Sequence, residues 1–407
     1  MRVCVVGSGG REHALASALS RSADVVVTPG NPGIPGSVAT SPDELEADLY
    51  VVGPEVPLVD GLADRLRARG ALVFGPGADG AQLEGSKAWM KEVLVAAGLP
   101  TAAHRCFGSD DAEAAVAFLR TLPGLYVVKT DGLAAGKGVL VTESLDEAVA
   151  DVREKLAGRA FGEAGRKVVI EEGMSGPEVS LLCLCDGRRA VALASAQDYK
   201  RVGDGDAGPN TGGMGAYSPV PAVDAAEGER LAEALVAPTL HELRRRGIDY
   251  RGVLYAGLML TPDGPKVLEY NVRFGDPETQ VVLPRWTGDV TAALAACAAG
   301  SLREQPTFLD ESAVTVVCAT EGYPQAPRTG DVIEGLADAA GVPGAQVFCA
   351  GVTAAEDGRL VTAGGRVLNV TGLGPTVADA RARAYEAVGR ISWPGMQARD
   401  DIAAHVS

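Results

Sequence analysis

The 407-residue chain is poor in the residues that build zinc and redox centres. It has four histidines and seven cysteines, and no two cysteines are separated by only two residues. Because structural zinc sites need closely spaced Cys and His ligands, we expect no zinc site. The cysteines are odd in number and scattered through apolar runs, which indicates free thiols and a reducing, cytoplasmic setting.

Long apolar runs and excess positive charge are also lacking. No run reaches the roughly 18 apolar residues that a membrane helix needs, and the first residues do not resemble a signal peptide. The net charge of −16 argues against nucleic acid or an anionic membrane as the partner. With 5% aromatics and 52 glycines, the composition favours βα units with tight turns, and the length suggests two or three domains.

The N-terminus predicts an anion site. Apolar residues 2–6 end in the turn Gly7-Ser8-Gly9-Gly10, and a helix is expected to follow. Backbone N–H groups and the positive end of the helix dipole then point into the turn, and we expect Arg11 and His13 to add anion-binding side chains.

A dinucleotide site is disfavoured at this turn. The third glycine of G-x-G-x-x-G would fall at Glu12, and the strand expected at 25–28 ends without an acidic residue for a ribose. An NAD-dependent oxidoreductase is therefore the weaker alternative to a phosphate-binding Rossmann-like unit. We expect further strands at 48–53 and 71–74, with a helix through Arg69 between them.

A glycine-rich hairpin follows an expected helix at 84–98 and another at 110–122. Residues 126–131 and 139–141 have strand character, and the loop 132–138 between them is rich in glycine. Such a loop can fold over polyphosphate, although a glycine hairpin alone is more often only a turn. Lys129 and Lys137 favour the phosphate reading, and the spacing does not match a P-loop.

Two further segments contain polar residues whose role the sequence leaves open. The strand expected at 167–172 ends in two acids, which can bind a base amine and ribose hydroxyls or be solvated at a strand end. Residues 197–219 form a long glycine-rich stretch in which we expect no strand; stretches of this length are often binding loops.

The segment L-E-Y-N-V-R-F-G-D-P-E-T-Q at 268–280 is the most informative. It is expected to pair with a strand at 252–260, and side chains two apart share a face, about 6–7 Å from each other. Glu269, Asn271 and Arg273 would thus present two oxygen ligands beside a cation, which suits Mg²⁺ on a nucleotide's phosphates. Alone, the pattern equally describes a half-exposed strand.

The rest of the chain is expected to contain helices at 226–246 and 283–300 and then a small α/β unit. That unit has strands at 314–318, 347–352 and 366–371 and a helix at 376–391. We identify no chemical cluster within it.

Seven segments together resemble the phosphoribosylamine–glycine ligases (glycinamide ribonucleotide synthetases) of the ATP-grasp superfamily. They are G-S-G-G-R-E-H-A-L (7–15), P-G-N-P-G (29–33), V-G-P-E-V-P-L-V (52–59), L-E-G-S-K (83–87), K-T-D-G-L-A-A-G-K-G-V (129–139), G-P-N-T-G-G-M-G-A-Y-S-P (208–219) and 269–280. The resemblance covers essentially the whole chain.

The resemblance implies an α/β architecture of three domains. These are a Rossmann-like N-terminal domain (1–82), an ATP-grasp domain (83–310) with a flap subdomain at about 103–170, and a C-terminal α/β cap (311–407). It further implies a cytoplasmic, monomeric enzyme of de novo purine biosynthesis. With ATP and Mg²⁺ or Mn²⁺, such an enzyme joins glycine to 5-phosphoribosylamine through glycyl phosphate, giving glycinamide ribonucleotide, ADP and phosphate.

Residue roles also follow from the resemblance. ATP would be held by Lys87, Lys129, Gly132, Gly136, Lys137, Gly138, Glu171 and Glu178, and the metal by Glu269 and Asn271. Catalytic roles fall to Arg273, Lys129 and Asp198. The two small substrates would meet Gly9, Gly10, Arg11, Glu12, Lys200, Arg201, Asn210, Gly213 and Asp276.

The chain departs from the family pattern at several points. The family usually has His at Tyr199, Phe at Tyr270 and Ala at Thr130, and the N-terminal unit is shortened between residues 31 and 53. Another ATP-grasp carboxylate–amine ligase stays the alternative. A non-catalytic nucleotide sensor is disfavoured, because it would be expected to have lost Glu269, Asn271 or Arg273.

Overall fold

The computed structural model describes residues 1–133, 138–159 and 166–406. Its N-terminal unit is a parallel sheet of order β2-β1-β3-β4. Both faces of its first strand are buried, as is typical of parallel sheets. The elements are β1 (Arg2–Gly7), α1 (Gly10–Leu19), β2 (Asp24–Pro29), β3 (Leu49–Val52), α2 (Glu55–Val59), α3 (Leu62–Ala68) and β4 (Val73–Phe74).

Two sequence predictions for this unit can be compared with the structure. The helix predicted to run through Arg69 is present as α3, and the short helix α2 precedes it, separated by Gly61 in a left-handed conformation (φ 76°). The helical stretch expected to be missing from the N-terminal unit is not seen: residues 30–48, all of which the structure describes, contain turns and neither a helix nor a β-strand longer than an isolated bridge.

The central unit is an antiparallel sheet of order β10-β9-β15-β16 with helices packed on it. The predicted hairpin is confirmed, and the helix predicted at 226–246 is present with a π-helical turn inside it. The elements are α4 (Ala78–Gly85), α5 (Lys87–Ala96), β9 (Glu178–Asp186), β10 (Ala190–Ala192), α9 (Ala225–Leu231), η3 (Ala232–Val236), α10 (Ala237–Arg245), β15 (Arg251–Thr261) and β16 (Gly264–Asn271).

Helix ends differ from the prediction where a side chain caps the backbone. The helix predicted from residue 84 begins at Lys87, because the Ser86 hydroxyl accepts a hydrogen bond from Trp89 N. The helix predicted from residue 283 begins at Val290, because Asp289 caps Ala292 N. The preceding elements are α11 (Thr279–Val282) and η4 (Leu283–Arg285), and the capped helix is α12 (Val290–Ala298).

The flap region is a separate antiparallel sheet of order β5-β8-β6-β7 with its own apolar core. The predicted strands on either side of the glycine-rich loop are confirmed as β6 and β7, which pair directly, and residues 134–137 of that loop lie outside the described residues. The elements are β5 (His104–Gly108), η1 (Ser109–Asp111), α6 (Ala112–Leu119), β6 (Tyr126–Thr130), β7 (Val139–Thr142), α7 (Leu145–Leu156) and β8 (Lys167–Glu172).

A five-stranded sheet of order β11-β14-β17-β21-β18 joins the middle of the chain to its end. The prediction that 197–219 contains no strand is wrong, because β14 completes its hydrogen bonding with β17. The elements are β11 (Gln197–Asp198), β12 (Arg201–Gly203), η2 (Asp204–Asp206), β13 (Ala207–Asn210), β14 (Gly215–Ser218), β17 (Ser312–Ala319), α13 (Leu336–Ala340), β18 (Ala345–Cys349), β19 (Val352–Ala354), β20 (Leu360–Thr362), β21 (Arg366–Gly374) and α14 (Val377–Val388).

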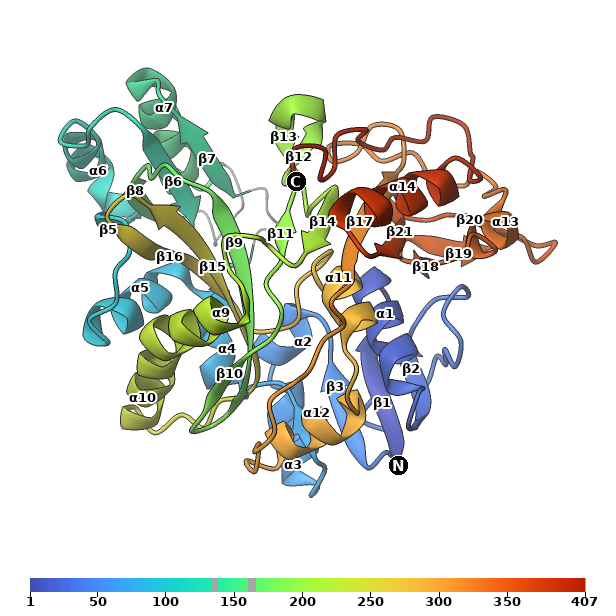
Figure 1. Ribbon diagram of the computed structural model, residues 1–407. Helices are drawn as coiled ribbons and strands as arrows, with labels where there is room; N and C mark the ends of the chain where they lie inside the picture. Colours follow the sequence, from blue (N-terminus) through green and yellow to red (C-terminus); the bar gives the residue numbers. More distant parts are fainter. Residues whose placement is uncertain (134–137, 160–165, 407) are drawn as a thin grey trace.

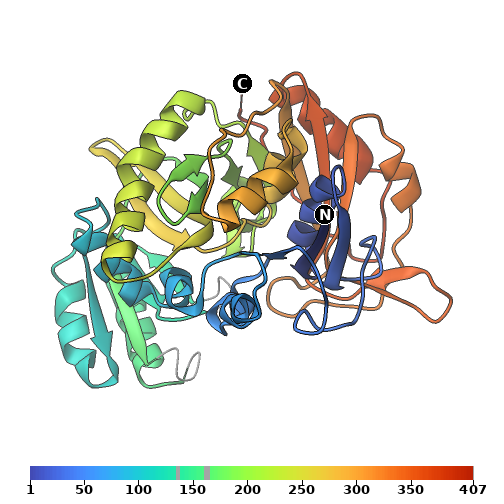
Figure 2. The same cartoon turned by 90° about the horizontal axis from the view of Figure 1, so that it is seen from below.

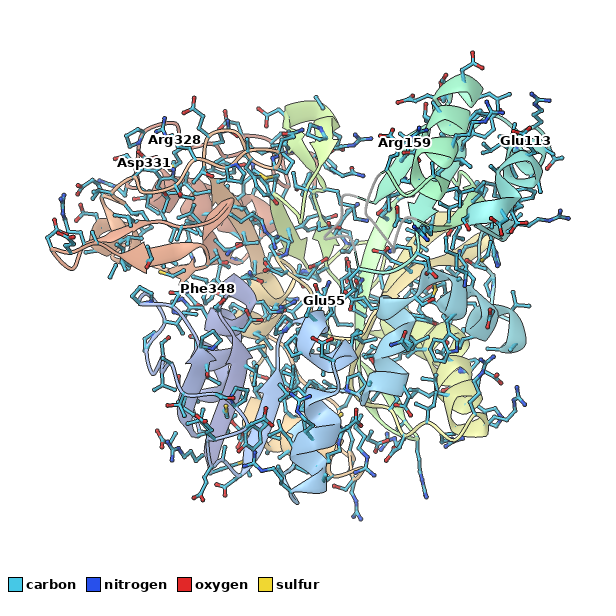
Figure 3. The ribbon with its side chains drawn as sticks, turned by 180° about the vertical axis from the view of Figure 1, so that it is seen from behind. Glu55, Glu113, Arg159, Arg328, Asp331 and Phe348 are labelled. Carbon is cyan, nitrogen blue, oxygen red and sulfur yellow. The ribbon has the colours of Figure 1, made fainter. Side chains whose placement is uncertain are left out.

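The four units are arranged around the middle of the molecule. The flap sheet and the C-terminal sheet lie at opposite ends, and the N-terminal sheet packs beside the C-terminal one (Figure 1, Figure 2). Glu55 lies centrally between these units, whereas Arg328 and Asp331 lie at the outer edge of the C-terminal unit (Figure 3).

All seven cysteines are free thiols, six of them buried. Within the described parts of the chain, no helix has the length and apolarity needed to cross a membrane.

Candidate functional site

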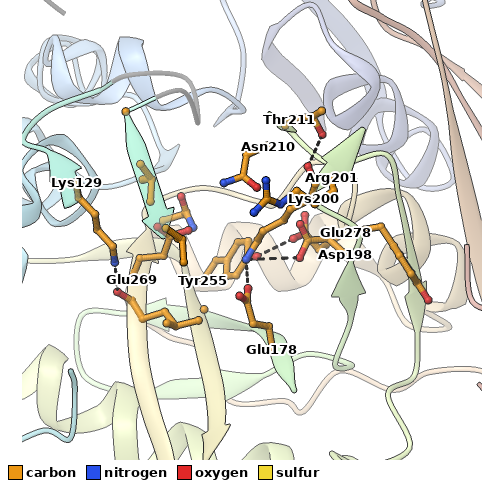
Figure 4. A pocket seen from close by; sticks show the side chains of 18 of the residues that line it. Lys129, Glu178, Asp198, Lys200, Arg201, Asn210, Thr211, Tyr255, Glu269 and Glu278 are labelled. Carbon is orange, nitrogen blue, oxygen red and sulfur yellow. Dashed lines mark hydrogen bonds and ion pairs between the residues drawn. The ribbon is translucent and has the colours of Figure 1, made fainter. Parts of the chain in front are cut away.

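A cavity of about 1050 Å³ lies where the units meet. Its lining comes from the N-terminal unit, the flap sheet, the central sheet and the C-terminal unit. Side chains of both charges gather in it, including Lys129, Asp198, Lys200 and Glu269 (Figure 4).

One end of the cavity combines lysines with an apolar slot. Lys87 begins α5 and donates a hydrogen bond to Gly132 O at 3.0 Å. Lys129, on β6, lies 3.1 Å from Glu171 on β8. The apolar part of the lining includes Leu125, Val127, Val139, Val141, Met174 and Leu268. A flat aromatic base with a polyphosphate tail matches this combination.

Glu171 is shared between two buried lysines. One carboxylate oxygen lies 3.1 Å from Lys129, and the other lies 3.1 Å from Lys91 of α5, whose side chain is 0% exposed. Burial would raise the pKa of Glu171, but the two lysines lower it overall. Burial lowers the pKa of Lys91 to about 8. The sequence analysis missed Lys91, since a lysine on an amphipathic helix normally indicates a solvated face.

The predicted metal ligands and the predicted catalytic arginine are brought together. Glu269 and Asn271 end β16 and line the cavity, and Arg273 Nη2 donates to Asn271 Oδ1 at 3.3 Å. Burial would raise the pKa of Glu269, but the charges of Lys200, Lys129 and Lys87 lower it. Glu269 is therefore an anionic carboxylate facing a cavity lined by cations.

Arg273 is held by two carboxylates that the sequence analysis did not single out. Its Nη2 lies 2.8 Å from Glu84 of α4, and its Nε lies 3.2 Å from Glu55 of α2. Burial would lower the pKa of Arg273, but Glu84 and Glu55 raise it, so the guanidinium stays charged. Both acids lie in segments that resemble the family, V-G-P-E-V-P and L-E-G-S-K. In each segment the acid stands next to a turn, and this position could have identified it as a candidate site residue.

A second charged group lies on the other side of the cavity. Lys200 forms an ion pair with Glu178 and lies 4.0 Å from Asp198 (Figure 4). Burial, only partly offset by Lys200, raises the pKa of Asp198 to about 7. Close by, Tyr255 donates a hydrogen bond to the buried Glu278 at 2.7 Å.

In the N-terminal turn, the side chain of Glu12 binds the groups that were expected to bind an anion. Glu12 accepts a hydrogen bond from Gly9 N at 2.6 Å and lies 2.5 Å from Arg11 Nε. Gly10 has no room for a side chain, because a Cβ would overlap the buried amide of Asn369 on β21. Arg11 lines the cavity, whereas Gly9, Gly10 and Glu12 are not part of its lining.

The expectation that His13 binds anions is wrong. Its Nδ1 accepts a hydrogen bond from Cys349 N at 2.8 Å, and its ring packs edge-on against Phe348. Burial lowers the pKa of His13 to about 4, so the imidazole is neutral. It joins the N-terminal unit to β18 instead.

The other predicted residues fall into three groups. Arg201, Asn210, Gly138 and Asp276 line the cavity. Gly132 is fixed by Lys87, and Gly213 lies just behind the wall. The predictions for Gly136 and Lys137 lie outside the described residues.

Models of the phosphoribosylglycinamide synthetase N domain, ATP-grasp (A) domain and C domain match residues 1–84, 85–279 and 313–405. A phosphoribosylamine–glycine ligase of Rhizobium meliloti is 49% identical over 419 residues, covering 99% of this chain and 98% of the relative. The similarity therefore extends over essentially the whole length of both chains.

Solved structures show the same architecture. The phosphoribosylamine–glycine ligase of Thermotoga maritima superposes with a TM-score of 0.86 at 36% identity, covering 99% of this chain and 100% of that one. A biotin carboxylase domain of Hydrogenobacter thermophilus, in complex with MgADP, has a TM-score of 0.73 at 18% identity, with 98% and 91% covered. The latter likeness concerns the fold alone.

Proposed function

Because the chain belongs to the phosphoribosylglycinamide synthetase family, we propose that it joins glycine to 5-phosphoribosylamine at the expense of ATP. The products would be glycinamide ribonucleotide, ADP and phosphate. One observation carries the proposal: a single cavity brings together three groups of residues. These are the lysines with the apolar residues beside them, the group Glu269, Asn271 and Arg273, and residues from the segment 197–213.

The proposed reaction has two steps. The carboxylate of glycine attacks the γ-phosphate of ATP and gives glycyl phosphate and ADP. The amine of 5-phosphoribosylamine then attacks the acyl carbon and expels phosphate. Phosphoryl transfer requires positioning and charge neutralisation rather than a protein nucleophile. Lys87, Lys129 and Arg273 supply fixed positive charge for it.

The nucleotide would lie between the flap and central sheets. One carboxylate oxygen of Glu171 is buried, and its contact with Lys129 at 3.1 Å leaves it able to accept a further hydrogen bond. A buried acceptor in this state is suited to an amine of the base or a ribose hydroxyl. This supports the predicted role of Glu171, and Lys129 would reach the phosphates from the same place.

Glu269 and Asn271 fit a divalent cation. Carboxylate and amide oxygens are the ligands that Mg²⁺ and Mn²⁺ accept, and Mg²⁺ typically takes only one or two carboxylates beside substrate phosphates. Among the described residues no cluster of three or more His, Cys, Asp or Glu could hold a metal by itself. The bound cation would neutralise phosphate charge.

Asp198 is suited to accept a proton from the attacking amine. A carboxylate whose pKa lies near 7 exchanges protons readily at neutral pH. Its neighbour Lys200 would keep part of the population ionised.

ADP release by the purified protein tests the proposal. The assay contains Mg-ATP, glycine and 5-phosphoribosylamine generated in situ, and each component is omitted in turn. We expect ADP only when all three are present, together with glycinamide ribonucleotide. ADP without dependence on the two small substrates would contradict the proposed acceptor pair and favour another carboxylate–amine ligase.

The oligomeric state, the domain boundaries and the location in the cell are also part of this proposal. We propose a monomer of three domains, at 1–82, 83–310 and 311–407, that acts in the cytoplasm on small molecules. Sedimentation at increasing concentration would test the monomer: a mass above 41.7 kDa would contradict it.

A further inference from the structure

The C-terminal unit, to which the sequence analysis assigned no chemistry, forms part of the cavity wall. Its contribution consists of Tyr323, Pro324, Pro327, Gly365, Arg366 and His405. Among these, Arg366 at the start of β21 contacts two segments that come from the centre of the chain.

The Arg366 guanidinium joins the 210–213 loop to the turn at Asp276. Its Nη1 donates to Gly212 O at 2.5 Å, to Gly213 O at 3.3 Å and to Asp276 O at 2.9 Å. Its Nη2 lies 3.1 Å from Asp276 Oδ2. A planar guanidinium can make these contacts together, whereas a lysine ammonium cannot.

Other contacts leave the loop little freedom once Arg366 is in place. Gly212 N donates to the Tyr323 hydroxyl at 3.1 Å. Gly213 has φ +107°, and a Cβ there would lie 2.5 Å from Pro277 Cδ. The loop is thus fixed between the C-terminal unit and the Asp276–Pro277 turn.

Arg366 also fixes the charge and orientation of Asp276. Burial would raise the pKa of Asp276, but Arg366 and then Arg11 lower it, so the carboxylate is ionised. Its other oxygen accepts a hydrogen bond from Gln280 Nε2 at 2.9 Å. Both carboxylate oxygens therefore have a fixed partner.

We propose that Arg366 is a positioning residue that holds the 210–213 loop and Asp276 as the wall for the two small substrates. The expected effects on the KM values of the two small substrates rest on the proposed function. Among the described residues, the Arg366 side chain contacts Gly212, Gly213 and Asp276 and not the nucleotide-end group of Lys87, Lys129 and Glu171, so we expect its effect on the opposite side of the cavity.

The kinetic test compares Arg366→Met with Arg359→Met. Arg359 is 58% exposed, lies on the same C-terminal segment and pairs only with Asp357 and Glu334 among the described residues. For Arg366→Met we expect the KM values for glycine and 5-phosphoribosylamine to rise at least ~10-fold, since small misplacements of binding groups are costly. The KM for ATP should change less than about twofold. Arg359→Met should resemble the wild type.

A rise in the KM for ATP equal to that for the small substrates would overturn the proposal, as would unchanged KM values for all three. If Arg366→Met does not fold, Tyr323→Phe provides the second variant. It removes only the hydroxyl that holds Gly212 N, and we expect the same selective rise with a smaller amplitude.

Hydrogen exchange separates this inference from the proposed function, because it needs no substrate. Amides of residues 208–215 should exchange faster in Arg366→Met than in the wild type and Arg359→Met. Unchanged exchange in this segment would refute the positioning role even if the enzyme proved to use other substrates.

Discussion

Lys91 illustrates how a single buried charge can matter at the residue scale. It is fully buried, and it holds Glu171 and donates to Thr101 Oγ1 at 2.7 Å. Lys91→Met should lower the free energy of unfolding by about 3–5 kcal/mol, because it leaves a buried carboxylate with only Lys129 as its partner. Chemical denaturation measures this loss.

The double variant Lys91→Met/Glu171→Gln should be no more stable than Lys91→Met, since the buried Lys129 then loses the carboxylate that lies 3.1 Å from it. Lys266→Met, a half-buried lysine on β16, is the control and should stay within about 0.5 kcal/mol of the wild type. A Lys91→Met protein as stable as the control would show that Glu171 does not need its second cation.

Glu269 carries the most direct prediction about catalysis. Glu269→Ala should lower kcat by at least ~10²-fold, because it removes the carboxylate proposed to hold the metal. The fold should be retained, as judged by circular dichroism. Asp263→Ala, an exposed acid in the turn of the same hairpin, is the matched control. Normal turnover of Glu269→Ala would refute the metal assignment.

Residues on one short strand could be predicted from the sequence, because their alternation fixes a shared face. Glu269, Asn271 and Arg273 were found in this way. Lys91 and Arg366 could not be found, since each acts through partners in distant segments, and the distance between Arg366 and Asp276 depends on the whole fold.

At the element scale, the π-helical turn η3 receives a hydrogen bond from a tyrosine hydroxyl of the central sheet. Tyr270, on β16, donates to Leu235 O at 2.7 Å and lies 2.8 Å from Thr239 Oγ1. Tyr270→Phe should destabilise the protein by about 1–2 kcal/mol, because it leaves a buried carbonyl with fewer donors. Its kcat and KM values should be unchanged, since the hydroxyl points into the helix packing. Thermal unfolding together with steady-state kinetics checks both parts.

Long, regular strands were predictable from periodicity and from the turn between them, as β15 and β16 show. The short strands β11 and β14 were not, because β14 is stabilised by its pairing with β17 and β11 by its pairing with β14, rather than by their own sequences. Short strands of two to four residues lack enough alternation to be recognised.

At the scale of the whole molecule, the contact between the N-terminal unit and β18 should respond to pH. Neutral His13 accepts a hydrogen bond from Cys349 N, and its pKa of about 4 lies below the ordinary value of 6.5. The unfolded chain therefore binds a proton that the folded chain does not, and stability falls as the pH is lowered from 6.5 toward 4.

His13→Gln keeps an acceptor but cannot be protonated. Its free energy of unfolding should decline less than that of the wild type over this pH range, measured by denaturation at several pH values. His241→Gln, on the exposed face of α10, should follow the wild type. Parallel pH profiles for the wild type and His13→Gln would contradict the assignment.

The order of the domains along the chain could be expected from the motifs. That strands from two of these domains would form one sheet could not be expected. Sequence analysis placed a boundary at 310/311, whereas the sheet of β11, β14, β17, β21 and β18 continues across it. Pairing between distant segments leaves no local signal, because the sequence of a strand does not say which distant strand lies beside it.

This shared sheet has a consequence for synthesis on the ribosome. Ser218 of β14 pairs with Ala313 of β17, so about a hundred residues must be translated in between, which takes roughly 5–20 s. During that interval β14 presents an unpaired edge, which is prone to aggregation unless it is protected. Arg366 emerges later still. A nascent chain that is released early would therefore lack both its sheet partner and the wall of its cavity.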